Sequence, residues 1–334
     1  MTTPIASFSL AARATLNMHS LNNEGSEGNQ IQTRMVEIVD SSGTLHSVNA
    51  LSGDMLKHIL MEHFYQLARA REISLCESCS RFNANRINAD KRFLRETEKV
   101  SDAQFISAML KLCAIDDVAG VLVTEGKRSI PRKSISEFGW VIGLPDKTRT
   151  ESYLHVKYVA ERGKEKRSED AAAQEKTGSN LGQSLFHRPA SSGVYAIVCH
   201  LELARIGYND ILQEYAFEGE QERVQRAKLL LESLLHTFIE LNGAMRSSQL
   251  PHLVGLEGVI TTSAGVLPAP LVSPLMSGEN EQGYQSQTES IVTALNGTDT
   301  PTVQMQTFTS ISEFATQMRT LIDTTTPFRI RVGR

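Results

Sequence analysis

Residues 14–29 read ATLNMHSLNNEGSEGN and join an alternating segment to a loop rich in asparagine and glycine. Just upstream and into this stretch, apolar residues occupy every second position: Phe8, Leu10, Ala12, Ala14, Leu16 and Met18. This period of two predicts a half-buried strand. In the loop over residues 21–29, asparagine and glycine permit sharp turns and positive φ, and glycine lets a ligand backbone approach closely. Spacing alone favours a plain strand-to-strand turn.

The next predicted helix begins after Ser52, a favourable N-cap residue. Its apolar residues recur at helical spacing: Met55, Leu56, Ile59, Leu60, Phe64 and Leu67. Gly53 would expose the first free N–H groups of the helix, where anions bind, and Lys57 and His58 lie about one turn further along. Ordinary capping with an exposed lysine explains the same residues equally well.

The rest of the chain predicts a mixture of helices and strands. Two further helices start at capping pairs, Ser101 with Gln104 and Ser310 with Glu313. A long amphipathic helix is predicted over 221–241, and strands are predicted at 34–39, 44–48, 119–124, 139–144, 153–159, 193–203, 303–308 and 328–332. Weakly patterned stretches predict loops at 161–182 and 273–301. This order is compatible with a β-α-β-β-α-β core, which is a known RNA platform.

The composition is that of a globular protein with 334 residues and a net charge of -4. That charge argues against indiscriminate nucleic-acid binding but permits a local basic groove. Basic residues cluster at 81–95, 127–133, 157–176 and 329–334, and each cluster alone is best explained as a solvated face. The sequence contains no apolar run long enough to cross a bilayer and no signal pattern, and its four cysteines indicate a reducing compartment. We therefore expect a cytoplasmic protein with no membrane partner.

Catalytic motifs do not stand out in the sequence. There is no G-x-S-x-G nucleophile elbow, no phosphate-binding loop and no dinucleotide fingerprint. His58, Glu62 and His63 do not have the spacing of a zinc hydrolase helix. We expect a protein that is not an enzyme.

Cys76-x-x-Cys79, with Cys113 downstream, is half of a zinc site, and a fourth ligand is missing by residue type. The fourth ligand would have to be His63, Asp116 or Asp117. Reduced, partly buried thiols are the simpler explanation. No cofactor is required, and a structural zinc is the alternative.

Four stretches together resemble the DevR-like branch of the RAMP superfamily, the repeating backbone subunit of type I CRISPR surveillance (Cascade) complexes. They are ATLNMHSLNNEGSEGN (14–29), VNALSGDMLKHILMEH (48–63), SSGVYAIVCHLELARIG (191–207) and GAMRSSQLPHL (243–253). The resemblance extends from near the N-terminus to about residue 260, and only the combination is specific.

The resemblance implies an α+β fold with three parts. A ferredoxin-like, RRM-type palm would comprise residues 1–63 and 151–334, a helical finger insertion residues 64–150, and a thumb hairpin about residues 160–192. Copies of such a subunit stack along the guide RNA, and their thumbs interrupt it at regular intervals. The implied partners are crRNA, target DNA through the guide, copies of the chain itself, other Cascade subunits and a recruited effector.

The resemblance and the polar patterns together indicate which residues would contact the guide RNA. They are Asn17, Asn22, Asn23, Glu24, Gly25, Gly28, Asn29, Ser52, Gly53, Lys57, His58, Arg132, Lys133, Arg246 and Ser247. Such a protein should hold phosphates and 2′-hydroxyls rather than read bases, because pairing supplies the sequence information. The alternative is a type III-like subunit that cleaves target RNA with a metal-dependent thumb carboxylate such as Asp170.

Overall fold

The computed structural model describes residues 2–22, 25–158, 183–275, 283–297 and 301–331. Its centre is a sheet with the strand order β15-β14-β2-β11-β10-β6-β5. These strands are β2 (Ser7–His19), β5 (Met35–Val39), β6 (Leu45–Leu51), β10 (Val141–Tyr158), β11 (Gln183–Leu201), β14 (His252–Ser263) and β15 (Val303–Phe308). Three short strands join it off this path: β3 (Gly25–Glu27), β4 (Gln30–Gln32) and β9 (Ser136–Phe138).

The remaining strands form small separate pairs. They are β1 (Thr3–Ile5) with β16 (Thr325–Pro327), β7 (Val121–Val123) with β8 (Ile130–Arg132), and β12 (Tyr208–Asn209) with β13 (Glu214–Tyr215). The helices are α1 (Gly53–Ala70), α2 (Lys91–Glu96), α3 (Asp102–Leu112), α4 (Ala114–Ala119), α5 (Gln221–Ile239), α6 (Tyr284–Asn296) and α7 (Ile311–Thr324). Short 3-10 turns occur at Cys79–Arg81, Arg86–Ala89 and Leu203–Arg205. The mixture of helices and strands agrees with the predicted α+β class.

Strand β2 confirms the predicted strand and lies between two antiparallel partners, β11 and β14, but the alternation ends before Met18, which is exposed and has a φ of +54°. The apolar side chains Phe8, Leu10 and Leu16 of β2 are buried. Ser9 and Ala11, on the opposite face, are buried as well, because Ser9 donates a hydrogen bond to the carbonyl of Ala269 and Ala11 packs with Val259 and Tyr284. The strand is therefore covered on both faces in its first half, although the sequence predicted burial on one face only.

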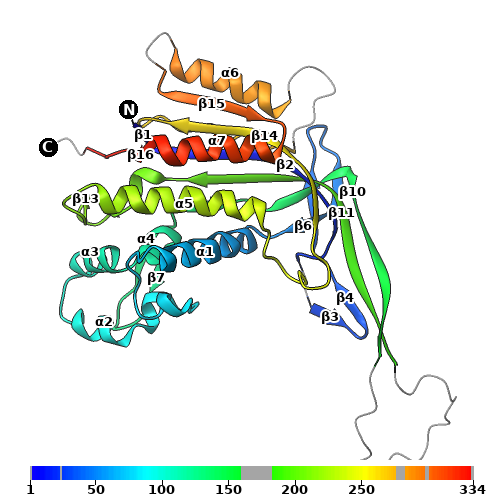
Figure 1. Ribbon diagram of the computed structural model, residues 1–334, viewed down its shortest axis with the longest axis horizontal. Helices are drawn as coiled ribbons and strands as arrows, with labels where there is room; N and C mark the ends of the chain where they lie inside the picture. The colour runs from blue at the N-terminus through cyan, green and yellow to red at the C-terminus, as the bar shows by residue number, and fades with distance from the viewer. Residues whose placement is uncertain (1, 23–24, 159–182, 276–282, 298–300, 332–334) are drawn as a thin grey trace, which may run out of the picture.

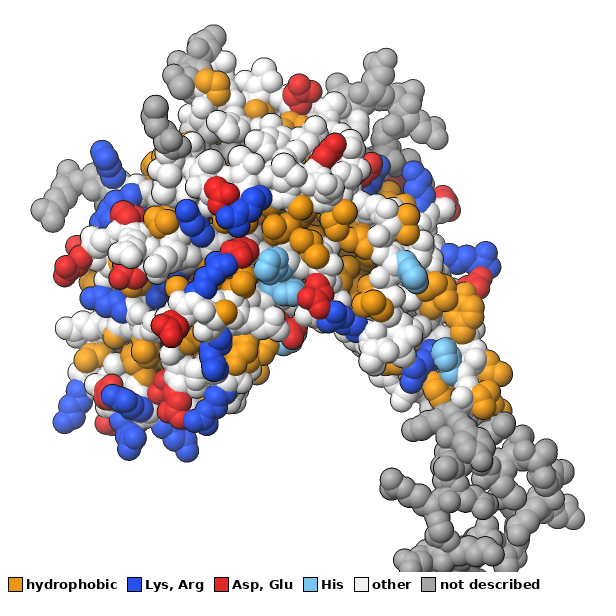
Figure 2. Space-filling model, viewed as in Figure 1, with side chains coloured by type: hydrophobic (Ala, Val, Ile, Leu, Met, Phe, Trp, Pro, Cys, Tyr) orange, Lys and Arg blue, Asp and Glu red, His pale blue; other side chains and the backbone are white. Residues whose placement is uncertain are grey.

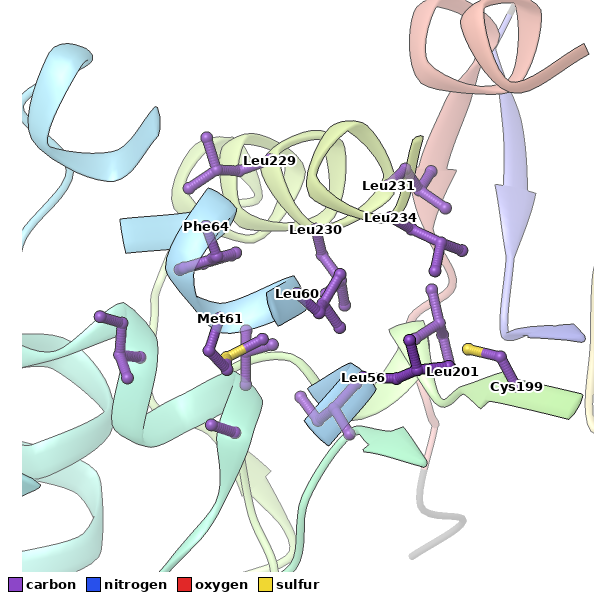
Figure 3. Packing of buried hydrophobic residues seen from close by; sticks show 14 of the residues in the cluster. Leu56, Leu60, Met61, Phe64, Cys199, Leu201, Leu229, Leu230, Leu231 and Leu234 are labelled. Carbon is purple, nitrogen blue, oxygen red and sulfur yellow. The ribbon is translucent and has the colours of Figure 1, made fainter. Parts of the chain in front are cut away.

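Helices α1, α5 and α7 lie side by side over one face of the sheet (Figure 1). Leu60 of α1 and Leu230 of α5 point toward one another, next to Leu201 of β11 (Figure 3). Each fully buried leucine contributes about 1.5–3 kcal/mol through removal from water. The apolar periodicity of the two predicted helices is thus explained by this shared core.

The predicted helix starts are confirmed by their caps. The Ser52 hydroxyl accepts a hydrogen bond from the Met55 amide, and Ser101 with Gln104 forms a capping box with both of its hydrogen bonds. Ser310 caps α7 through the Glu313 amide. Local side chain–backbone chemistry alone therefore placed these helix starts correctly.

Strands β10 and β11 are much longer than the sequence predicted and continue beyond the sheet as a two-stranded ribbon (Figure 1). We define the ribbon by its described paired residues, 148–158 and 183–193. The ribbon departs where the register shifts at Gly143/Thr148, opposite Gly193. A Cβ atom at Gly193 would lie 2.3 Å from the carbonyl oxygen of Lys147, and its φ is +154°. Glycine is therefore needed for the close backbone approach at this bulge.

Several predicted boundaries differ from the structure. The predicted finger limits, 64 and 150, fall inside α1 and β10, and the segment that leaves the sheet runs between α1 and β9. We call this segment, residues 71–135, the helical segment. Of the predicted thumb, 160–182 lies outside the described residues and 183–192 belongs to β11.

The predicted loop at 273–301 is wrong over α6, and the predicted strand at 328–332 is not formed over its described residues, 328–331. Helix α6 is rich in polar residues, but Tyr284 and Thr288 are buried, and Tyr284 packs on Ala11 and Val259. Tertiary packing therefore stabilises a helix that its composition conceals. At the C-terminus, β16 ends at Pro327, and the Phe328 carbonyl accepts a hydrogen bond from Arg223 instead.

Candidate functional site

The loop predicted at 21–29 forms part of a small hairpin that lies against the ribbon. Strands β3 and β4 pair with each other, and β4 lies beside β11, where the Asn29 carbonyl accepts a hydrogen bond from the His187 amide at 2.8 Å. Gly25 and Gly28 have φ values of +115° and +58°, as their residue type predicted. Both are exposed, together with Asn29. The hairpin is thus held by backbone bonds and presents these three residues on its surface.

Asn22 has a different place from the exposed hairpin residues. It is buried, its amide donates to the Ala50 carbonyl, and its side-chain oxygen accepts a hydrogen bond from the Thr33 hydroxyl at 3.0 Å. These bonds tie the start of the hairpin to β6. Asn23 and Glu24, which we also expected to contact RNA, lie outside the described residues.

The segment after α5 packs against the same region (Figure 1). The Ala244 amide donates to the Leu21 carbonyl at 3.3 Å, and a Cβ atom at Gly243 would lie 2.4 Å from the Leu21 side chain. Further along, Ser248 accepts a hydrogen bond from Arg188 of the ribbon at 3.1 Å. Two of the stretches that carried the resemblance, 14–29 and 243–253, therefore meet at the base of the ribbon.

Arg246 and Ser247 lie in this segment, but only Ser247 has a side chain that is exposed and not paired with a carboxylate. The Arg246 guanidinium contacts the side chains of Glu240 and Asn242, whereas Ser247 is exposed. The pairing with Arg246 keeps the pKa of the Glu240 carboxyl below its usual range. Because this ion pair is largely exposed, its partner could be exchanged for a phosphate at little cost.

The first turn of α1 is occupied by protein groups. The Ser52 hydroxyl caps the helix, and a Cβ atom at Gly53 would lie 2.5 Å from the Phe138 carbonyl oxygen. Gly53 therefore allows β9 to pack against the helix start. The close packing against β9 explains why this position is glycine, in addition to the anion site that the sequence suggested.

Lys57 and His58 line a pocket of about 280 Å³ beside α1, together with Asn83 and Arg86 of the helical segment. Burial lowers the pKa of Lys57, and the nearby Arg86 guanidinium lowers it further. Two cations that face one pocket repel each other, so an anion bound between them would relieve this repulsion. Asp54 also lines the pocket and offsets part of the positive charge. We call this the Lys57–Arg86 pocket.

Two contacts between arginine and an aromatic ring lie near these groups, and sequence reasoning missed both. The Arg34 guanidinium lies 5.0 Å from the ring centroid of Trp140, which is 44% exposed. On the ribbon, the Arg188 guanidinium lies 4.7 Å from the Phe186 ring centroid. An exposed ring such as that of Trp140 is a typical surface for stacking an unpaired base, whereas Phe186 and Arg188 are half-buried. A lone tryptophan within the predicted strand 139–144 was the only signal for the first pair.

Arg132 does not lie on a surface where it could contact RNA. Its side chain is buried and its guanidinium bonds to Asp117 at 2.7 Å, so the predicted RNA contact is not supported and its role is structural. Lys133 is exposed, but it pairs with Glu137 and Glu202. The basic cluster at 127–133 thus contains a buried network that a charge count cannot recognise.

Asn17 lies on β2, opposite His252 of β14, and is half-buried. The strand therefore places it at the same end of the sheet as the hairpin formed by β3 and β4. Asp170, the candidate nuclease carboxylate, lies outside the described residues.

The three expected zinc ligands come together with one of the three candidates for the fourth position. Ligand atoms of Cys76, Cys79, Cys113 and Asp116 all lie within 4.8 Å of one another. His63 instead bonds to the Glu240 carbonyl at 3.0 Å. Burial raises the pKa of both the Cys113 thiol and the Asp116 carboxyl.

The space between the helical segment and the ribbon forms a broad concave face (Figure 2). Helix α1 and the segment after α5 reach this space from one side and the ribbon from the other (Figure 1).

Residues 10–287 match the model of a family described as CRISPR-associated negative auto-regulator DevR/Csa2. The chain belongs to the DevR/Csa2 family. The resemblance that the four sequence stretches predicted is confirmed.

One of three similar solved structures agrees with the general fold of this DevR/Csa2 protein. A chain of a CRISPR RNA-guided surveillance complex has a TM-score of 0.50 at 10% identity, covering 95% of this chain and 98% of that chain. A chain of such a complex described as pre-nicking has a TM-score of 0.45 at 12% identity, with 87% and 88% covered. Csc2 of Thermofilum pendens has a TM-score of 0.38 at 14% identity, with 96% and 86% covered. No curated protein matches the sequence.

In the described part of the DevR/Csa2 protein, none of the helices combines the length and apolar character needed to span a membrane.

Proposed function

We propose that this DevR/Csa2 protein is a non-catalytic backbone subunit of a type I Cascade complex, which binds crRNA and presents it for pairing with target DNA. The observation that carries the proposal is the concave face between the helical segment and the ribbon, where segments far apart in the sequence meet. The family match supports a CRISPR-associated role. The complex would act in the cytoplasm, with further Cascade subunits and a recruited effector as partners.

The strand order supports a ferredoxin-like, RRM-type palm. Strands β14-β2-β11-β10 are neighbours in the sheet, and the chain passes through β2, α1, β10, β11, α5 and β14 in turn. This is the β-α-β-β-α-β succession. In this proposal the helical segment is the finger and the ribbon belongs to the thumb. The sheet face opposite α1 and α5 is partly covered by α6 and residues near Ala269, so we place the RNA along the concave face.

The charges favour binding to the phosphate backbone over base reading. The net charge of -4 argues against a broadly basic surface, but Lys57 and Arg86 share a pocket, Arg188 lies on the ribbon, and Arg246 lies in the segment that contacts Arg188. Separated basic groups can hold successive phosphates along one strand. The exposed Trp140 ring offers a stacking surface without sequence preference.

The ribbon supports assembly into a filament of copies. Tyr153, Leu154, Val156 and Leu185 are exposed on it. A projecting ribbon with exposed apolar side chains is typical of a segment that packs against another molecule. A neighbouring copy would cover these side chains, and the guide would be interrupted where the ribbon crosses it.

Direct measurement of RNA binding tests the proposal. Full-length chain expressed alone should co-purify with RNA of mixed length, and Lys57→Ala with Arg86→Ala should weaken binding equally for unrelated RNA sequences. Loss of two phosphate contacts should reduce the slope of the logarithm of the binding constant against the logarithm of the salt concentration by roughly one to two units. Arg319→Ala, on the exposed face of α7, is the matched control and should leave the slope unchanged. A folded chain that binds no single-stranded RNA at low salt would overturn the proposal.

The alternative of a nuclease with a thumb carboxylate such as Asp170 is not favoured by the family match. Incubation of the assembled complex with guide-complementary RNA and magnesium separates the two functions. We expect intact target RNA. Regularly spaced cuts, abolished by Asp170→Ala, would show the alternative to be correct.

A further inference from the structure

Four side chains converge inside the helical segment, away from the proposed RNA contacts on the ribbon. Cys76 and Cys79 lie just after α1, Cys113 is the N-cap of α4, and Asp116 lies in that helix. All four are buried, at 1% exposure or less. One ligand atom from each lies within 4.8 Å of the other three. The cluster joins two parts of the chain that are separated by more than 30 residues.

The cluster is built from two units with the same spacing, Cys76-x-x-Cys79 and Cys113-x-x-Asp116. In the first, the Cys79 amide donates to the Cys76 sulfur at 3.3 Å. In the second, the Asp116 amide donates to the Cys113 sulfur at 3.5 Å. Backbone N–H groups directed at sulfur stabilise a thiolate, as the amides around metal-bound cysteines do. The second unit was hidden in the sequence because its last ligand is a carboxylate.

The two sulfur-to-oxygen separations in the cluster fit the edges of a tetrahedron around one ion, and all ligand atoms lie within 4.8 Å of one another. The Cys76 and Cys79 sulfurs lie 3.4 Å and 3.5 Å from the same oxygen of Asp116. Ligand bonds of about 2.0–2.3 Å in tetrahedral geometry give edges of roughly 3.3–3.8 Å. A single ion could therefore contact all four ligand atoms after small side-chain adjustments.

The two adjacent carboxylates of α4 have different surroundings. Asp117, which is equally buried, is neutralised by Arg132 and Arg226 at 2.7 Å and 2.8 Å. In the part of the chain that the structure describes, Asp116 forms no ion pair and faces the sulfurs instead. A buried carboxylate is stable when a charge or a metal ion compensates it.

We propose that Cys76, Cys79, Cys113 and Asp116 bind one Zn²⁺ ion as a structural site. Three thiolates select a soft or borderline ion, and tetrahedral geometry with one carboxylate suits zinc. All four positions are taken by protein side chains, so no position remains for a substrate or an activated water. Zinc binding releases the thiol protons to solvent and changes no oxidation state.

The site would also shape the Lys57–Arg86 pocket. Cys79, Phe82, Asn83 and Arg86 line this pocket from the helical segment, and Ile115 lines it from α4. The metal would fasten these two walls to each other, while Ile87 donates its amide to the second oxygen of Asp116. Loss of the ion should therefore loosen the wall that carries Arg86. This last consequence rests on the proposed function, whereas metal binding does not.

Metal analysis of the untagged full-length chain tests the proposal. We expect about one zinc ion per chain in the wild type and less than about a tenth of that in Cys76→Ser. The matched control is Cys199→Ser, a buried cysteine of β11 outside the cluster, which should retain the zinc. A folded wild-type chain without zinc after growth in zinc-supplemented medium, or with iron in its place, would overturn the assignment.

Cobalt substitution keeps the test decisive where Cys76→Ser does not fold. Wild-type chain stripped with a chelator and reloaded with Co²⁺ should show the intense visible bands of a tetrahedral site and sulfur-to-cobalt charge transfer. Chelation should lower the Tm, and added Zn²⁺ should restore it. Unchanged Tm and absent cobalt bands would count against the site. A chain that holds zinc but binds no RNA would leave the metal site standing and remove the proposed function.

Discussion

The Arg132 guanidinium lies 2.7 Å from the Asp117 carboxylate, and both side chains are almost completely excluded from solvent. Arg226 of α5 contacts the second oxygen of the same carboxylate at 2.8 Å. The Gly207 amide donates to it as well, at 3.0 Å. One buried carboxylate thus joins α4, β8 and α5, and fastens the helical segment to the helices over the sheet.

We predict that Asp117→Asn destabilises the protein strongly. The substitution leaves two buried arginines without their counter-charge, which costs about 3–5 kcal/mol. Urea unfolding at neutral pH measures the loss. Lys133→Ala, which removes an exposed pair one residue beyond Arg132, is the control and should cost less than about 1 kcal/mol. Equal effects of the two variants would show that the network is not a main support.

Trp140 should contribute to RNA affinity without contributing to its salt dependence. Its indole is 44% exposed and stacks with Arg34, so Trp140→Leu would remove a stacking surface worth about 1–3 kcal/mol per base. Binding to single-stranded RNA should weaken about ten-fold or more, with the slope against salt unchanged. Trp140→Phe should keep most of the affinity. A wild-type affinity in the leucine variant would exclude this ring from the interface.

The apolar pair on the ribbon should matter for assembly and not for folding. Val156 and Leu185 are opposite each other and are 54% and 44% exposed. Changing both to serine should reduce the number of copies bound per RNA, as measured by light scattering, with a change in unfolding free energy within about 0.5 kcal/mol.

The hairpin of β5 and β6 offers a matched control for this pair. Val39 and Leu45 are also opposite each other and are 62% and 63% exposed. Their replacement by serine should leave assembly unchanged. Equal loss of assembly in both double variants would indicate nonspecific hydrophobic association and not a specific contact of the ribbon.

Acid should destabilise the protein through His19. Burial lowers the pKa of this imidazole from 6.5 to about 4, and neither ring nitrogen has a hydrogen-bond partner among the described residues. Because the folded pKa lies below the unfolded value, the unfolded chain binds more protons as the pH falls from 6.5 toward 4, so stability decreases in this window. The full shift corresponds to about 3 kcal/mol.

His19→Leu isolates this contribution from the carboxylates that titrate in the same range. The stability of the wild type relative to the variant should fall by about 2–3 kcal/mol between about pH 7 and pH 4.5, measured by urea unfolding. A constant difference across this range would mean that His19 is solvated or protonated in the folded protein.

Local patterns predicted a large part of the fold. The strand predicted from Phe8 and the caps at Ser52, Ser101 and Ser310 were confirmed, because periodicity and capping act between residues close in sequence. Helix α6 was missed because its stability depends on packing against distant residues. The ribbon was predicted as shorter strands because pairing between β10 and β11 is not visible in either segment alone.

The proposed interface was only partly predictable from sequence. Lys57 and His58 were recognised beside a helix start, but Asn83 and Arg86, which complete their pocket, lie in a stretch without periodicity. For Arg132 and Arg188, the charge pattern of the sequence did not predict where the side chain lies. The first belongs to a basic cluster and is buried, and the second lies on the ribbon at the base where distant segments meet.

By itself the sequence predicted most of the local elements, the family and the three cysteines of the buried cluster. Only the tertiary structure showed which of His63, Asp116 and Asp117 joins the three cysteines, because His63 contacts the Glu240 carbonyl and Asp116 faces the sulfurs. Asp116 and Asp117 are neighbours on α4, but a helix turns by roughly 100° per residue, so their carboxylates point in different directions. Packing places Asp116 against the sulfurs of Cys76 and Cys79, and Asp117 against Arg132 and Arg226.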